Sequence, residues 1–135
     1  MQPMTVLLVA SGGTVATIRD SLSNRGYSLL VAETAAAGED RLREGGIDVV
    51  VVEYEIPGGI EAFAQALERL PDPPPFVLVA GTAEAPVVSA RLGAAALLTK
   101  PLSADDLIAV LQRMIRAAPT TSFDDSPTGP LERPT

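Results

Sequence analysis

Short runs of aliphatic residues recur along the chain and alternate with stretches of helical periodicity. The runs lie at residues 5–10, 28–33, 48–53, 76–80 and 95–100. In each run the apolar residues are continuous instead of alternating with polar ones, which is typical of parallel strands covered on both faces. We therefore predict five strands at these positions.

The segments between the runs carry apolar residues at helical spacing. Two of them have clear apolar faces, formed by Val15, Ile18 and Leu22 and by Ile60, Phe63, Leu67 and Leu70. Weaker or shorter helices are predicted at 35–46 and 85–93. A last helix is predicted to start at Ser103, where Ser103 and Asp106 form an S-x-x-D cap. Strands that alternate with helices predict an open, mostly parallel α/β sheet.

Composition and charge narrow the class of protein. The 135 residues are enough for one domain, and a hydrophobic fraction of 47% argues against general disorder. Cys and His are absent, which excludes disulfides, thiol catalysis, serine-triad chemistry and nearly every zinc site. The net charge of −7 without a basic run argues against binding to nucleic acid or an anionic membrane.

The two ends of the chain differ from its middle. The N-terminal apolar run is short and has no basic region before it, so we expect neither a signal peptide nor a membrane anchor, and a cytoplasmic location. After Ala117 the segment is rich in proline and lacks apolar periodicity. We predict one domain over residues 4–117 and a disordered tail or linker over 118–135.

Several chemically informative residues lie where the predicted strands end. In open α/β sheets, ligands and chemistry gather at the carboxyl ends of the strands. The first strand ends in "ASGG", the third in Glu53, the fourth in "AGTAE" and the fifth in "TKP".

These residues carry a resemblance to a known family. The segment from Glu53 through Pro57 and Gly58 resembles the phosphoacceptor segment of response-regulator receiver domains, which follows D-x-x-x-P-G, and Lys100-Pro101 is similar to that family's Lys-Pro. The match spans roughly residues 4 to 117. It implies a flavodoxin-like α/β fold with parallel strands in the order 2-1-3-4-5 and helices on both faces. It also implies a signalling role in two-component systems.

The chain departs from the family where the phosphorylation chemistry is done. Ala10 and Ser11 stand where the family has its acidic pair, and Glu53 stands at the phosphoacceptor aspartate. Thr82 follows the fourth strand later than the family's phosphate-gripping Thr or Ser, and Leu97 replaces the switch aromatic. Because Mg²⁺ needs several oxygen ligands, we expect no tight Mg²⁺ site and no cofactor. The resemblance thus implies a pseudo-receiver that is not an enzyme.

Three interpretations of the site stay open. Glu53 could pair with Lys100, to which it should lie close, either as a permanent mimic of a phosphorylated state or as a tolerated remnant. The domain could also be phosphorylated at an atypical site. Alternatively, Gly12 and Gly13 could present backbone amides to an anion or small molecule. The simpler expectation for the glycines is a turn before a helix capped by Thr14.

We also predict a protein-binding face. The last predicted helix has a wide apolar arc, and the short helix before it is rich in valine. The proposed face is built around Val88, Ile108 and Ile115. The partner is expected to be a sensor kinase, an effector domain or a second copy of the chain.

Overall fold

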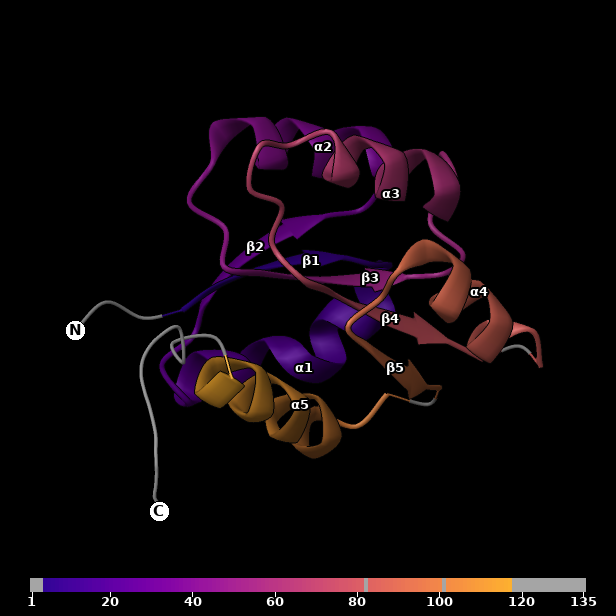
Figure 1. Ribbon diagram of the computed structural model, residues 1–135. Helices are drawn as coiled ribbons and strands as arrows, with labels where there is room; N and C mark the ends of the chain where they lie inside the picture. Colours follow the sequence, from indigo (N-terminus) through magenta and orange to yellow (C-terminus); the bar gives the residue numbers. More distant parts are fainter. Residues whose placement is uncertain (1–3, 82, 101, 118–135) are drawn as a thin grey trace, which may run out of the picture. The chain divides into compact units, whose positions relative to one another are not determined.

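The computed structural model describes residues 4–81, 83–100 and 102–117. Strands and helices alternate along it, as Figure 1 shows. The elements are β1 (Thr5–Val9), α1 (Gly12–Asn24), β2 (Ser28–Ala32), α2 (Ala35–Glu44), β3 (Val49–Glu53), α3 (Ile60–Glu68), β4 (Phe76–Ala80), α4 (Ala85–Leu92), β5 (Ala96–Thr99) and α5 (Ala104–Ala117). Thr82, the Lys100-Pro101 bond and the predicted tail at 118–135 lie outside the described residues.

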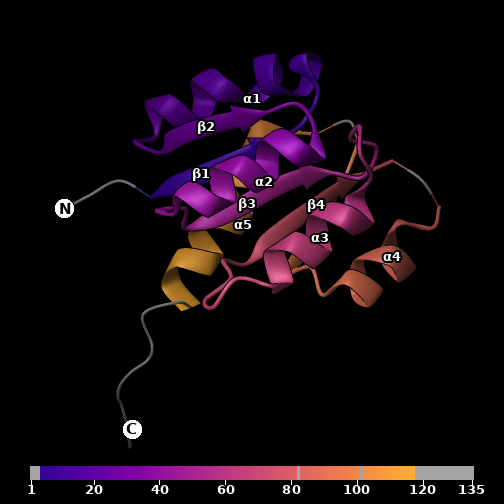
Figure 2. The same cartoon turned by 90° about the horizontal axis from the view of Figure 1, so that it is seen from above.

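The five strands form one parallel sheet in the order β2-β1-β3-β4-β5. This confirms the predicted flavodoxin-like topology. Val9 of β1 pairs with Val52 of β3, and Ala80 of β4 pairs with Thr99 of β5. The register therefore aligns the carboxyl ends of the central strands at one edge of the sheet. Figure 2 shows β2, β1, β3 and β4 side by side from above.

The described part of the chain divides into two compact units, with the boundary between Ala104 and Asp105. The first unit contains the whole sheet and α1 to α4. The described part of the second unit is α5, a helix with acidic residues Asp105 and Asp106 in its first turn. Negative charges in the first turn stabilise the helix because they interact favourably with the positive end of the helix dipole.

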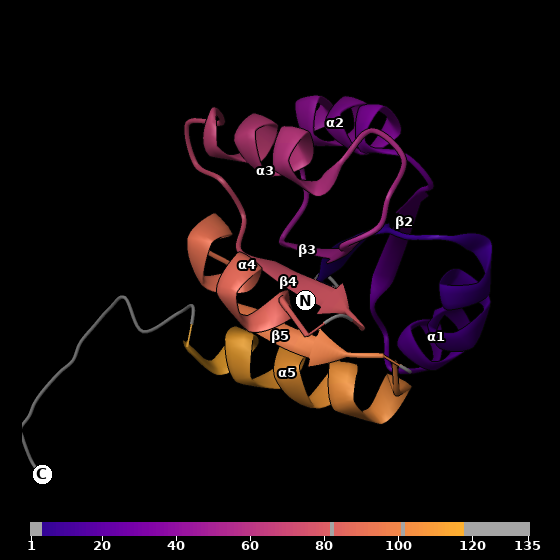
Figure 3. The ribbon, with the colours of Figure 1, turned by 90° about the vertical axis from the view of Figure 1, so that its right-hand side faces the viewer.

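Helices of the first unit lie on both faces of the sheet. Figures 1 and 3 show α2 and α3 on one face and α1 on the opposite face. The strands are mainly apolar because both faces of the sheet must be covered, and all five residues of β3 are buried, including Glu53.

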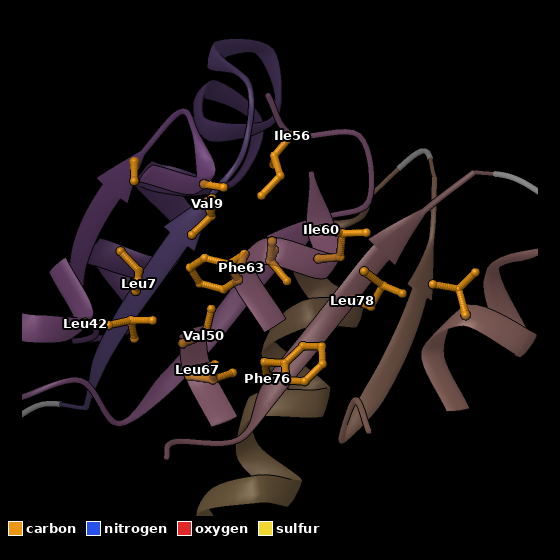
Figure 4. Close-up of a cluster of buried hydrophobic side chains, with 14 residues drawn as sticks. Leu7, Val9, Leu42, Val50, Ile56, Ile60, Phe63, Leu67, Phe76 and Leu78 are labelled. Atoms are coloured by element: carbon orange, nitrogen blue, oxygen red, sulfur yellow. The ribbon is translucent and has the colours of Figure 1, made fainter. Parts of the chain in front are cut away.

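A cluster of buried side chains joins the sheet to α2, α3 and α4. Figure 4 shows Phe63 of α3 at its centre, near Val9 and Val50. Gly38 of α2 allows this close approach: a Cβ at that position would lie 2.7 Å from Cε1 of Phe63 and 3.1 Å from Cγ2 of Val9. The helix can therefore pack this closely on the core only with glycine there.

Candidate functional site at the carboxyl ends of the strands

The ends of β3 and β5 bring Glu53 and Lys100 together. Glu53 is the last residue of β3, and Lys100 follows β5, with its N–H bonded to the carbonyl of Ala80 at 3.1 Å. Nζ of Lys100 lies 2.8 Å from Oε2 of Glu53. The predicted ion pair is confirmed.

Glu53 is buried, with an exposed fraction of only 4%. The N–H of Ser11 donates to its Oε1 at 2.6 Å, and Oγ1 of Thr14 donates to its Oε2 at 2.6 Å. With Lys100, three donors hold one carboxylate. A buried charge is tolerated when it is paired and hydrogen-bonded in this way. Glu53 is therefore paired with Lys100, as expected, and it is held by two further donors and is not exposed to solvent.

Thr14 is a site residue that the sequence interpretation missed. Helix α1 begins at Gly12 with Ser11 as its N-cap, so Thr14 lies within the first turn and is not the cap. Gly12 and Gly13 likewise belong to the helix and do not form a turn before it. The spacing holds a signal that could have found Thr14. A residue three positions after an N-cap lies over the same end of the helix, where a strand-tip carboxylate can meet it.

The partners of the pair shift both pKa values. Burial tends to raise the pKa of Glu53, but hydrogen bonds from Lys100, Thr14 and the Ser11 N–H, with the charge of Lys100, outweigh it and hold the pKa below its usual value. The hydrogen bond to Glu53 raises the pKa of Lys100, and the nearby charges of Glu53 and Glu55 add to this against the opposing effect of burial. Both groups are therefore charged at neutral pH.

A second carboxylate, that of Glu55, lies near the ammonium group of Lys100. Oε1 of Glu55 lies 3.5 Å from Nζ of Lys100, and the Glu55 side chain is 64% exposed. Lys100, the single lysine of the chain, therefore bridges a buried and an exposed carboxylate.

The positions equivalent to the acidic pair carry no oxygen ligand for a metal. Ala10 is fully buried, and Ser11 contributes its backbone N–H, a donor, to Glu53. Within residues 4–81, 83–100 and 102–117, no group of three or more His, Cys, Asp or Glu side chains is arranged to hold a metal ion. The absence of a tight Mg²⁺ site stays a prediction, which a titration can test.

A pocket of about 340 Å³ opens beside the ion pair. It is lined by Ser11, Gly13, Thr14, Thr17, Lys100 and Leu102. Three of its lining residues carry hydroxyl groups and one carries an ammonium group, and the pocket is large enough for a small polar molecule.

The other predicted site residues lie apart from the ion pair. Leu97, at the switch-aromatic position, is partly buried and packs against the core cluster. Val88 is buried in that cluster, so the structure does not support it as part of an exposed protein-binding face. Ile108 on α5 is buried too, whereas Val87 of α4 is 71% exposed. The valine-rich composition of α4 did not reveal which valine is exposed: Val88 is turned inward and Val87 outward. Ile115 is the third residue of the predicted face and lies on α5.

No helix in the described part of the chain is long and apolar enough to cross a membrane. No family model and no curated protein matches the chain.

Solved structures do match it. The receiver domain of a signal transduction histidine kinase from Syntrophus aciditrophicus superposes with a TM-score of 0.78 at 20% identity, covering 90% of this chain and 97% of that one. The non-phosphorylated HemR receiver domain from Leptospira biflexa gives 0.73 at 24% identity, covering 87% and 98%. A putative response regulator from Chloroflexus aurantiacus gives 0.76 at 20%, covering 85% and 99%. By its structure, the chain has the fold of response-regulator receiver domains.

Proposed function

We propose that the chain is a receiver-like module of a two-component or phosphorelay system that acts by protein contact without being phosphorylated. The fold supports the receiver part of the proposal, although a fold alone does not decide function. One observation supports the rest: both oxygens of the Glu53 carboxylate are engaged, Oε1 by Ser11 and Oε2 by Thr14 and Lys100.

The chemistry of phosphoryl transfer explains why this observation matters. The transfer needs an accessible acceptor oxygen and a Mg²⁺ ion that neutralises developing charge. The acceptor-equivalent oxygens are buried and hydrogen-bonded, and Ala10 and Ser11 supply no carboxylate. An ammonium group already lies within 2.8 Å of Oε2, where a second cation would be repelled. The module is therefore not catalytic, and it works without Mg²⁺ or another cofactor.

A titration tests the proposal. Isothermal titration with Mg²⁺ should show no binding at low micromolar concentration, and incubation with Mg²⁺ and a small acyl phosphate should leave the intact mass unchanged. The matched control is the triple variant Ala10→Asp, Ser11→Asp, Glu53→Asp, which supplies three carboxylates and should gain Mg²⁺ affinity. Tight Mg²⁺ binding or a phosphoryl adduct in the unaltered protein would refute the proposal.

The partner in this proposal is another protein in the cytoplasm: a sensor kinase, an effector domain or a second copy of the chain. Among the described residues, Val87 is a large apolar residue that is well exposed and that such a partner could cover. Light scattering of the unaltered protein and of the Val87→Glu variant tests self-association. A dimer that the variant loses would identify the partner as a second copy. A monomer in both would leave a different protein as the partner.

The pocket beside Lys100 favours a second candidate function, the binding of a small anionic molecule. Its hydroxyl groups and its ammonium group are suited to such a ligand. A thermal-shift screen with small anions tests this function. A saturable rise in the unfolding temperature that the Lys100→Met variant loses would support it, and no response to any anion would exclude it.

A further inference from the structure

Three donors from two separate segments of the chain converge on the carboxylate of Glu53. They are the N–H of Ser11 before α1, Oγ1 of Thr14 in the first turn of α1, and Nζ of Lys100 after β5. We propose that these groups form a carboxylate-binding site whose ligand is the chain's own Glu53. This inference deepens the proposed function and rests on it in one respect, that Glu53 is not modified.

The donors have the character of an anion site. Ser11 is the N-cap of the 13-residue helix α1, so its N–H lies at the end of the helix where the helix dipole favours negative charge. The Thr14 hydroxyl and the Lys100 ammonium add a second hydrogen bond and a full positive charge. The donor distances of 2.6, 2.6 and 2.8 Å are those of charge-assisted hydrogen bonds.

The register of the sheet explains why glutamate fills this site. Val9 pairs with Val52, so the backbone of Glu53 lies beside that of Ala10, one residue before Ser11. Its side chain must therefore reach beyond the end of β1 to meet the amino end of α1. Aspartate would withdraw the carboxylate by roughly one carbon–carbon bond, about 1.5 Å. The extra methylene of Glu53 thus places the carboxylate against the Ser11 N–H and Thr14.

The charges around the site define the class of ligand. Lys100 supplies one positive charge, and Glu55 lies 3.5 Å from the same ammonium group. A second negative charge on the ligand would be repelled by Glu55. The site is therefore suited to a monocarboxylate and not to a dianion such as phosphate or sulfate.

Truncation of Glu53 allows a direct test with added carboxylates. The Glu53→Ala variant lacks Cγ and the carboxyl group, which together have the heavy atoms of acetate, whereas the Glu53→Gly variant lacks the heavy atoms of propionate. The adjacent pocket lined by Thr14 and Lys100 gives these anions a route to the donors. We expect acetate to raise the unfolding temperature of Glu53→Ala more than propionate does, and the order to reverse for Glu53→Gly.

Three controls make the result specific. Sodium chloride and sulfate at matched ionic strength should not reproduce the rise, and the unaltered protein should not respond to acetate. The double variant Glu53→Ala, Thr14→Val should respond less than Glu53→Ala. An acetate response equal to that of chloride, or equal in the unaltered protein, would overturn the inference.

A second measurement does not depend on the truncated variants being folded. In the Thr14→Val variant of the otherwise unaltered protein, loss of one donor should raise the pKa of Glu53, as measured by NMR of its side-chain carboxyl carbon. An unchanged pKa would overturn the inference. Phosphorylation of the unaltered protein would instead refute the proposed function and leave the acetate response of Glu53→Ala unaffected, so the two failures can be told apart.

Discussion

Replacing Glu53 by glutamine removes one charge from the buried end of β3 and leaves the shape of the side chain nearly unchanged. The amide oxygen can still accept from Ser11 or Thr14. The neutral amide cannot balance the charge of Lys100. The NH₂ group of the amide is itself a donor, so it cannot accept a hydrogen bond as the carboxylate oxygen in its place did. The variant therefore tests the charge of the site separately from its packing.

The solvent exposure of Glu53 and Lys100 sets the size of the expected loss of stability. Breaking a fully buried ion pair costs about 3–5 kcal/mol, whereas an exposed pair is worth about 0–1 kcal/mol. The side chain of Glu53 is 5% exposed but that of Lys100 is 34% exposed, so water can partly solvate the orphaned ammonium group. We expect a loss of about 2 kcal/mol in the free energy of unfolding. For a domain of this size, that lowers the melting temperature by roughly 8 °C.

Urea unfolding followed by far-UV circular dichroism measures the loss directly. The matched control is Glu55→Gln, which removes the exposed partner of the same lysine and should change the free energy of unfolding by less than about 0.5 kcal/mol. The double variant Glu53→Gln, Lys100→Met should be less destabilised than the two single losses together, because the two groups are coupled. A loss below about 0.5 kcal/mol for Glu53→Gln would refute the reasoning, since Glu53 would then behave as a surface residue.

Two further predictions concern the same ion pair, and a third concerns the packing of α2 on the core. The pKa of Glu53 lies below its ordinary value of 4.5, so the ionised side chain stabilises the fold above that pH. Acid unfolding curves should therefore show the difference in stability between the unaltered protein and Glu53→Gln shrinking as the pH falls through the pKa that Glu53 has in the folded protein. Lys100 of the unaltered protein should react with an amine acylating reagent more slowly than Lys100 of the Glu53→Gln variant, because the ion pair raises the pKa of Lys100. Peptide mass spectrometry, with the terminal amine as internal reference, measures the two rates, and equal rates would contradict the prediction. The Gly38→Ala variant should have a free energy of unfolding lower by about 1–2 kcal/mol, because the added Cβ would clash with Phe63. The Gly13→Ala variant has open space around the added Cβ, so its free energy of unfolding should rise by about 0.5–1 kcal/mol. A Gly38→Ala variant more stable than the unaltered protein would contradict the packing argument.

The order of the elements could be predicted from the sequence because each is specified by local pattern. The continuous apolar runs placed all five strands within a residue or two of their observed ends. The helices predicted at 35–46 and 85–93 end one or two residues earlier than expected, at Glu44 and Leu92. Gly45 and Gly93, which follow them, adopt a positive φ of 79° that other residues rarely adopt, so glycine is the local signal for both ends. Signals of this kind act over a few residues, so they can be detected along the chain.

Pairing at the strand ends was predictable in part. Parallel strands in the order β2-β1-β3-β4-β5 bring their carboxyl ends to one edge, so the approach of Glu53 and Lys100 followed from topology.

The inward orientation of Val88 could not be predicted from the sequence, because a short helix with adjacent valines can bury either one. Contact with the core cluster decided which valine it was.

Only the tertiary structure decided how Glu53 is held. Its contacts with Ser11 and Thr14 span 42 and 39 residues, and they depend on the register of β1 against β3 and on the exact residue at which α1 begins. A shift of one residue in either would remove the donors from reach, and no local pattern determines both. Sequence alone therefore determined that a carboxylate ends β3 next to a lysine, while the packing of α1 against that strand end decided that the carboxylate is buried and bound.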